Sequence, residues 1–239
     1  MVNILLITDS RGREIKSRIQ THQDLKHLNL ELQYYPGATL ETIQKKIERL
    51  QRGCRNNIWD HIIVIAGICN FTTRTKDRDR KPHIAYTNRN TEAICHTIDT
   101  LLNIHENIHI CTITPAVLHK ASDRQDTDIE SEQLNLEEDI SEVNQHIINQ
   151  NIQKDRPTFD LAKLSTIRSV KKQGLKKKRI IRLNQHHLED GVHPSSPLQE
   201  LWIRYIKNMV IKITNAEYAL EDDNTEDEDS GNFKRQPKN

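Results

Sequence analysis

Three side chains that can do chemistry together lie near opposite ends of this 239-residue chain. Ser10 follows a short apolar segment near the N-terminus, and Asp190 and His193 stand close together near the other end. A hydroxyl, an imidazole and a carboxylate are the groups that acyl transfer through a serine requires. The hydroxyl attacks a carbonyl, the imidazole takes its proton, and the carboxylate orients the imidazole. These residue types predict a serine hydrolase, provided that the fold brings them together.

Each part of this set also has a simpler interpretation. A serine directly after a strand often serves only as the N-cap of the next helix. An Asp-x-x-His pair is short enough to arise by chance, and Asp24 and His27 form a second copy in a polar stretch that we interpret as solvated surface. The copy at 190–193 lies in a loop with glycine and proline, immediately before a helical pattern. The chemistry therefore depends on the elements that position the three residues.

Apolar runs alternate with amphipathic segments along the chain. The runs predict buried strands at 2–7, 30–35, 62–66 and 108–113, with a short fifth strand at 158–161. Helical spacing of apolar residues predicts helices over 39–53, 94–102, 140–148 and 196–213. This order favours an α/β fold, a three-layer α/β/α sandwich around a parallel five-stranded sheet of flavodoxin-like type. Ligands bind such sheets beyond the carboxyl ends of the strands, where Ser10, Gly37 and Gly67–Asn70 would lie.

Composition divides the chain into a folded domain over 1–215 and an acidic tail over 216–239. Hydrophobic residues make up 35% of the chain and aromatic residues 4%, which is low for a globular protein. We therefore expect a polar loop at 119–139 and a basic loop at 163–189. The tail has many acids and little apolar surface to bury, so we expect it to be unstructured.

Two basic segments, 74–81 and 168–182, raise the question of a polyanionic partner. The second carries eight lysines and arginines and no acid. Such segments can contact phosphates, so nucleic acid is one partner to consider. The first segment follows Gly67–Asn70, so a loop there should border the ligand pocket, and an anionic substrate is a second possibility. The simpler interpretations are a solvated charged loop for 74–81 and, for the second segment, pairing with the acidic tail or a nuclear-import signal. No aromatic residue interleaves with 168–182, which argues against base stacking there.

Other features limit the classes of protein to consider. The four cysteines form no C-x-x-C pair, which favours reduced thiols in a cytoplasmic or nuclear protein. No basic region precedes the first apolar run, so we predict a strand there rather than a signal peptide. No apolar run approaches the ~20 residues of a membrane span. His186 and His187 have no recognised metal-ligand spacing, so we predict neither metal nor cofactor.

The order of the short motifs resembles that of the SGNH (GDSL) hydrolase superfamily. Those enzymes carry Gly-Asp-Ser after the first strand, a glycine after the second, Gly-x-Asn-Asp after the third and Asp-x-x-His before the last helix. The corresponding stretches here are Thr8-Asp9-Ser10, Pro36-Gly37-Ala38, Gly67-Ile68-Cys69-Asn70 and Asp190-Gly191-Val192-His193. The resemblance covers about residues 3–213. Within the superfamily the chain is most similar to the esterase-type domains of eukaryotic mobile elements.

The resemblance implies an activity and the residues that carry it out. The protein would be a serine esterase that hydrolyses a small acyl ester through an acyl-enzyme, with no cofactor. Ser10 would be the nucleophile, His193 the general base and Asp190 the carboxylate that orients it. The alternative is a weakly active or inactive SGNH-like module that binds nucleic acid or protein.

The resemblance also implies an oxyanion hole made by the backbone N–H groups of Ser10 and Gly37 and the side chain of Asn70. Asp9, Gly67 and Cys69 would border the substrate. A strict alignment places Cys69, a poor hydrogen-bond donor, where the oxyanion asparagine should be. Either the loop shifts by one residue so that Asn70 serves, or the hole lacks this donor. Asn70 could also be a turn residue that bonds its own backbone.

Overall fold

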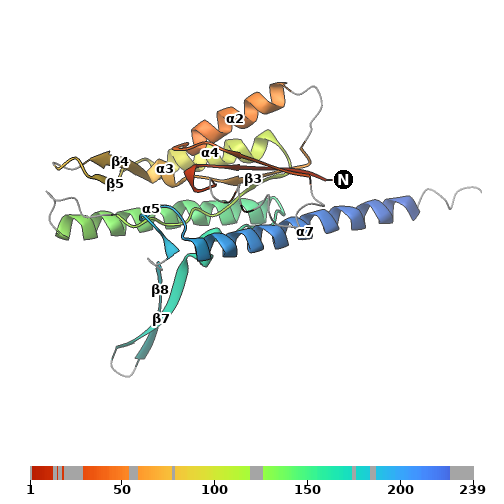
Figure 1. Ribbon diagram of the computed structural model, residues 1–239. Coiled ribbons are helices and arrows are strands. Elements are labelled where there is room, and N and C mark those ends of the chain that lie inside the picture. The colour runs from red at the N-terminus through yellow and green to blue at the C-terminus, as the bar shows by residue number, and fades with distance from the viewer. Residues whose placement is uncertain are drawn as a thin grey trace, which may run out of the picture.

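A parallel sheet of four strands forms the centre of the molecule (Figure 1). The computed structural model describes residues 2–12, 15, 18, 29–53, 59–76, 79–118, 126–173, 176–183 and 187–226. The strands of the sheet run in the order β2-β1-β3-β6, and every neighbouring pair is parallel. Their bounds are β1 (Asn3–Thr8), β2 (Asn29–Tyr34), β3 (His61–Ile65) and β6 (Ile108–Ile110).

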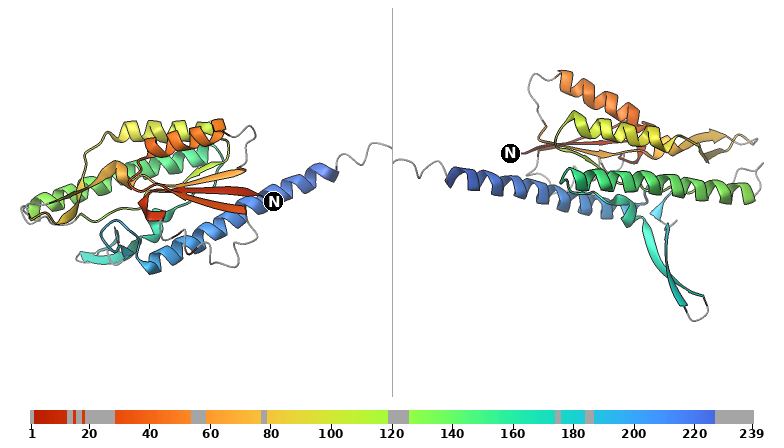
Figure 2. Two further views of the ribbon diagram at one scale, coloured as in Figure 1. Left: turned by 45° about the horizontal axis from the view of Figure 1, so that its top comes forward. Right: turned by 180° about the vertical axis from the view of Figure 1, so that it is seen from behind.

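Helices cover both faces of this sheet, as the left view of Figure 2 shows. One layer contains α2 (Leu40–Gly53), α4 (Thr91–Ile104) and α5 (Asp126–Gln153), and the other contains α7 (Ser196–Glu226). Along β1, Leu5 and Ile7 pack toward the first layer, whereas Ile4 and Leu6 pack toward α7. A strand buried on both faces must be apolar throughout, which explains its continuous hydrophobic run. The predicted α/β fold with a parallel sheet is confirmed.

The predicted fifth strand at 158–161 is wrong. One ladder-like hydrogen bond does form there, from Thr112 N–H to the Phe159 carbonyl at 3.0 Å. The next amide, that of Asp160, instead donates to the Tyr205 hydroxyl at 3.1 Å, and the Asp160 carboxylate caps the short helix α6 (Leu161–Leu164). The apolar residues of this segment are buried, but α6 takes the backbone away from the sheet. Burial alone therefore produced the strand-like pattern.

The predicted polar loop at 119–139 is also wrong over the part that the structure describes. Helix α5 begins at Asp126, so 126–139 are helical. A narrow apolar stripe, with Leu136 and Ile140 almost fully buried, packs this polar helix against the first layer. The high proportion of acidic and amide side chains, which suggested a loop, instead belongs to the solvent-exposed face.

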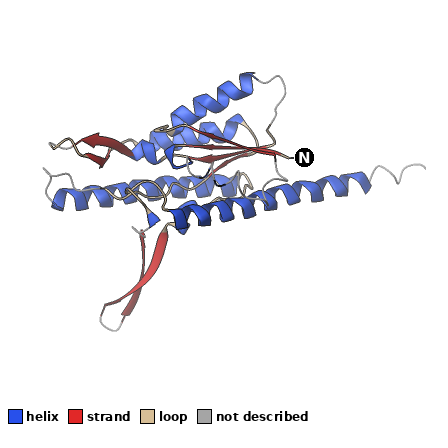
Figure 3. Cartoon of the chain, in the orientation of Figure 1, coloured by secondary structure: helices blue, strands red, loops and turns tan. Residues whose placement is uncertain are grey.

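Two antiparallel hairpins stand outside the central sheet (Figure 3). The first is β4 (Thr72–Lys76) with β5 (Pro82–Tyr86), directly after the short helix α3 (Ile68–Phe71). The second is β7 (Thr166–Gln173) with β8 (Lys176–Leu183), which projects from the body of the molecule. Most of the predicted basic loop at 163–189 is therefore a paired ribbon, because cross-strand backbone hydrogen bonds form regardless of side-chain charge.

The acidic C-terminal segment departs from prediction as well, since the backbone of α7 is helical through 216–226. Six of these eleven residues are alanine, leucine or glutamate, which have high helix propensity. The rest of the predicted tail, 227–239, lies outside the described residues, as do Asp24, His27, Cys54 and His186. The other three cysteines are free thiols. In the described part of the chain, no helix combines the length and apolar character needed to span a bilayer.

Candidate active site

All three predicted catalytic residues line one cavity of about 490 Å³. Ser10 reaches it from the end of β1, and Asp190 and His193 reach it from the loop before α7. Tyr34 and Pro36, at the end of β2, form another part of the wall. The cavity therefore lies at the carboxyl ends of the parallel strands, where α/β folds bind their ligands.

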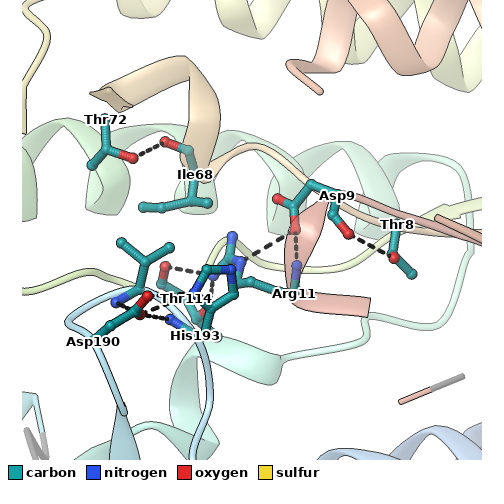
Figure 4. A network of polar contacts seen from close by, with 9 residues as sticks. Thr8, Asp9, Arg11, Ile68, Thr72, Thr114, Asp190 and His193 are labelled. Atoms are coloured by element: carbon teal, nitrogen blue, oxygen red, sulfur yellow. Dashed lines mark hydrogen bonds and ion pairs between the residues drawn. The ribbon is translucent and has the colours of Figure 1, made fainter. Parts of the chain in front are cut away.

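His193 and Asp190 form a closely bonded pair (Figure 4). The His193 Nδ1 atom lies 2.8 Å from Asp190 Oδ2 and 2.9 Å from Oδ1. An ionised carboxylate only accepts hydrogen bonds, so Nδ1 carries the proton and Nε2 is left as a proton acceptor. Burial alone would raise the pKa of Asp190, but hydrogen bonds from the backbone and ring of His193 and from Val192 N–H outweigh it and lower the pKa. The Asp190 carboxylate is therefore charged at neutral pH.

The loop that carries this pair is fixed by its own backbone. Glu189 N–H donates to the His193 carbonyl at 2.9 Å, and Val117 N–H donates to the Gly191 carbonyl at 2.7 Å. Gly191 has a φ of +83°, a conformation that glycine adopts without strain. Val192 is buried against the first helical layer. The Asp190-Gly191-Val192-His193 sequence thus builds a tight turn that presents its imidazole and carboxylate together.

Ser10 begins the short 3-10 helix η1 (Ser10–Gly12). Gly12 N–H closes this turn on the Asp9 carbonyl at 3.1 Å, and a side chain on Gly12 would overlap that of Thr8. Among the described residues, no hydrogen bond joins the Ser10 hydroxyl to the His193 ring. Catalytic hydrogen bonds are often long without substrate and shorten in the reactive complex. The structure thus places Ser10 and His193 in one cavity without joining them directly.

The turn at Ser10 is anchored by an ion pair that the sequence analysis missed. Asp9 and Arg11 are both buried, with Arg11 Nε 3.5 Å from Asp9 Oδ1 and Arg11 N–H donating to the same oxygen at 3.0 Å. The Arg11 guanidinium also donates to the carbonyl of Thr114, at 3.0 Å, and to its hydroxyl (Figure 4). Arg11 therefore joins the turn at Ser10 to the segment that follows β6. Its only signal in the sequence is its position directly after Ser10.

Two of the predicted oxyanion donors are available. The N–H groups of Ser10 and Gly37 donate no hydrogen bond to another described residue. Gly37 has a φ of +71°, and an added Cβ would meet nothing within 4 Å. Conformation rather than crowding therefore favours glycine at this position. Its neighbour Pro36 lines the cavity, so the Gly37 amide lies close to the cavity wall.

The side chain of Asn70 lies elsewhere. It is fully buried at the start of α2, where its Oδ1 accepts from Leu40 N–H at 2.9 Å and its Nδ2 donates to both carboxylate oxygens of Glu41 at 3.0–3.1 Å. Burial would raise the pKa of Glu41, but hydrogen bonds from Thr39, from the backbone and from Asn70 outweigh it and lower the pKa. Asn70 therefore joins α3 to an ionised carboxylate on α2, away from the cavity wall.

The structure does not bring Asp9, Gly67 or Cys69 to the cavity wall. Gly67 precedes α3 with a φ of +122°, and an added Cβ would lie 2.5 Å from the Ile113 side chain. Burial, together with nearby Asp9 and against the opposing effect of Arg11, raises the pKa of the Cys69 thiol to about 11. Cys69 is therefore a protonated, half-buried thiol beside the Asp9–Arg11 pair.

Other cavity residues were not assigned there from the sequence. Arg74 reaches the wall from β4, and Glu189 reaches it from the position before Asp190. The sequence provided weak support for Arg74 at the cavity, because its basic segment was expected to border the pocket. Glu189 could have been found from its place beside the Asp-x-x-His motif, since such loops face the cavity.

Comparison with solved structures identifies the fold. No family model and no curated protein matches the chain. A GDSL-like lipase from Bacteroides thetaiotaomicron superposes with a TM-score of 0.59 at 14% identity, over 88% of each chain. A lipolytic G-D-S-L family protein from Veillonella parvula gives 0.56 at 12% identity, over 86% of this chain and 96% of the other. An acetyl xylan esterase from Geobacillus stearothermophilus gives 0.53 at 12%, over 87% and 94%. The chain has the SGNH hydrolase fold that its motifs predicted.

Proposed function

We propose that this protein is a serine ester hydrolase of SGNH type that cleaves a small acyl ester through an acyl-enzyme. The observation that carries the proposal is the bonded His193–Asp190 pair in the same cavity as Ser10. The cavity volume of about 490 Å³ is within the usual range for a small-molecule site. The similar solved structures include lipases and an acetyl xylan esterase, which supports an ester as the substrate class.

The chemistry follows from the free nitrogen of the imidazole. As the Ser10 hydroxyl attacks the ester carbonyl, His193 Nε2 takes its proton. His193 then gives that proton to the departing alcohol, which leaves an acyl group on Ser10. A water molecule, activated by the same nitrogen, attacks the acyl-enzyme and restores the serine. Asp190 stabilises the imidazolium that forms in each step.

We assign the oxyanion hole to the N–H groups of Ser10 and Gly37. Each such donor contributes about 3–4 kcal/mol to the lowering of the barrier. Asn70 could be a third donor only if its amide left Glu41, so we propose that it acts as a positioning residue. Its hydrogen bond to Leu40 N–H holds the segment that begins at Gly37.

The Asn70→Ala variant separates these two roles. A positioning role predicts a loss of stability of about 1–3 kcal/mol, because Leu40 N–H and the Glu41 carboxylate lose a buried partner, with kcat changed by less than about tenfold. Thermal unfolding and ester turnover measure the two effects. A fall in kcat of about 10²–10³-fold at unchanged stability would instead identify Asn70 as an oxyanion donor.

The central test of the esterase compares wild type with Ser10→Ala. Wild type should react with a fluorophosphonate probe and hydrolyse p-nitrophenyl acetate, and the variant should do neither. Ser141→Ala, on the exposed face of α5, is the matched serine control and should behave as wild type. Equal labelling and equal turnover by wild type and Ser10→Ala would overturn the proposal.

A second candidate function is nucleic-acid binding through the β7–β8 hairpin. The strand register places Lys171 opposite Lys178 and Lys172 opposite Lys177. Like charges directly opposite one another destabilise a hairpin, so a bound polyanion would stabilise it. The acidic residues of α7 from Glu217 onward begin about 32 Å along the helix from Ser196, at 1.5 Å per residue. Figure 1 shows α7 running away from the hairpin, so the backbone of 217–226 lies away from β7 and β8.

This second function is tested by binding of single-stranded RNA and DNA across a salt series. Affinity should fall steeply as salt rises, should survive Ser10→Ala, and should drop when Lys171, Lys172, Lys177 and Lys178 are changed together to glutamine. Absence of binding at about 50 mM salt would rule it out. Because the hairpin and the cavity use different residues, each function can be lost without the other.

A further inference from the structure

Arg74 stands at the wall of the catalytic cavity, on an element outside the central sheet. It lies on β4, where it is paired in register with Ile84 of β5. The base of this hairpin is fixed by Thr87 N–H, which donates to the Phe71 carbonyl at 2.8 Å, and by the Tyr86 hydroxyl, 2.5 Å from Asp139 Oδ2 on α5. The backbone of Arg74 is thus held in place, while its exposed side chain can reach a ligand.

The charges at this wall are unevenly neutralised. Arg11 is paired with Asp9, and Asp190 is paired with His193. Arg74 and Glu189 also line the cavity, and neither makes an ion pair with another described residue. Among the described cavity residues, Arg74 is therefore the cation that has no carboxylate of its own.

We propose that Arg74 binds an anionic group of the substrate, so that the esterase prefers esters with a carboxylate or phosphate near the scissile bond. The inference rests on the esterase proposed above. A guanidinium presents a planar fork of N–H donors that matches the oxygens of both groups. Glu189, the carboxylate at the wall that makes no ion pair with another described residue, would repel a second anion, which limits the substrate to one negative group on the side of Arg74.

The matched control for Arg74 is Lys76, two residues farther along β4. Lys76 is exposed, carries the same charge and does not line the cavity. A general electrostatic attraction of anions to this hairpin would depend on both residues. A contact with the substrate depends on Arg74 alone.

The experiment compares a neutral ester, p-nitrophenyl acetate, with an anionic one, the mono-p-nitrophenyl ester of succinic acid. In Arg74→Gln we expect kcat/KM for the anionic ester to fall about 10–100-fold, mainly through KM, with the neutral ester changed by less than about twofold. Lys76→Gln should leave the ratio of the two esters unchanged. Competitive inhibition by succinate and by inorganic phosphate, measured separately, shows which anion Arg74 favours, and both should weaken in Arg74→Gln.

Each contrary result is distinct. An unchanged ratio in Arg74→Gln, or an equal change in Lys76→Gln, overturns the inference and leaves the esterase intact. Equal loss on both esters overturns it in favour of a role for Arg74 in catalysis itself. If wild type neither turns over an ester nor reacts with the fluorophosphonate, the esterase proposal fails. Direct titration of wild type and Arg74→Gln with succinate and phosphate then decides the anion site, which fails if the two proteins bind alike.

Discussion

Two histidine–aspartate pairs in this molecule are almost alike in local geometry and differ in where they lie. His193 Nδ1 is 2.8 Å from Asp190, and His146 Nε2 is 2.7 Å from Asp99. The side chains are similarly exposed, at 36% and 41% in the first pair and 26% and 40% in the second. The first pair shares a cavity with Ser10, whereas the second joins α5 to α4 outside that cavity.

The difference shows that an imidazole with a carboxylate does not by itself make a catalytic site. Chemistry also requires a nucleophile within reach and the right nitrogen free. His193 uses Nδ1 for its carboxylate and keeps Nε2 for the serine, whereas His146 uses Nε2. Of the 12 histidines in the chain, two belong to an Asp-x-x-His motif, and the copy before the last helix is His193, whose ring is bonded in the arrangement that a triad needs.

The largest effect should come from replacing the base. His193→Ala should lower kcat/KM for p-nitrophenyl acetate by about 10³–10⁴-fold or more, because nothing then takes the proton of Ser10. His146→Ala removes an equally well-bonded imidazole and should leave kcat/KM within about twofold of wild type. Steady-state kinetics measure both. Similar losses of kcat/KM in the two variants would mean that the cavity shared with Ser10 does not distinguish His193 from His146.

A somewhat smaller loss should follow from changing the carboxylate. Asp190→Asn keeps an oxygen for the N–H groups of Val192 and His193, so the turn should remain folded. The amide cannot stabilise an imidazolium and favours the wrong tautomer, so kcat should fall about 10²–10⁴-fold. Asp99→Asn is the matched control, with kcat unchanged. Circular dichroism of both variants checks that the fold is retained, and normal turnover by Asp190→Asn would contradict the role of this carboxylate.

The sequence predicted much of this site because its motifs are local. The turn at 190–193 and the bend at Gly37 are specified by residues that touch within a few positions of one another. The parallel sheet then brings the carboxyl ends of its strands to one edge, which is how Ser10 could be placed beside a loop 180 residues away. The similarity to mobile-element esterases and the cytoplasmic or nuclear location stay predictions.

What the sequence could not show depends on long-range contacts. Arg11 is anchored by Thr114, 103 positions away, and no local pattern encodes that partner. Asn70 is buried against Glu41 because α3 packs on α2. Its short motif does not show this long-range contact, and it therefore suggested a cavity residue instead. The basic segment 168–182 was expected to lie in a loop, yet the backbone of 168–173 pairs with that of 176–181 in a ribbon. In each case tertiary structure outweighed the local preference.

A third histidine, His109, differs from both of these pairs, and we expect it to affect the stability of the fold rather than turnover. This is the smallest of the effects that we predict. His109 on β6 is buried, lies 3.1 Å from a ring nitrogen of His61, and packs on Phe159 with ring centroids 5.6 Å apart. Burial, followed by the positive influence of His61, Arg156 and His105, lowers the pKa of His109 to about 3. This imidazole therefore stays neutral, and its role is to pack in the core and to hydrogen-bond with His61.

Because the pKa of His109 is lower in the folded chain than the ordinary 6.5, the unfolded chain binds more protons between these two values. Its contribution to stability is therefore complete above pH 6.5 and is lost as the pH falls toward 3. The slope from this residue is at most about 1.4 kcal/mol per pH unit. Urea unfolding at several pH values should show this slope in wild type and a shallower one in His109→Gln, whereas His146→Gln, whose ring faces a carboxylate, should not flatten it. Identical pH profiles for wild type and His109→Gln would mean that the buried imidazole accepts a proton in the folded state.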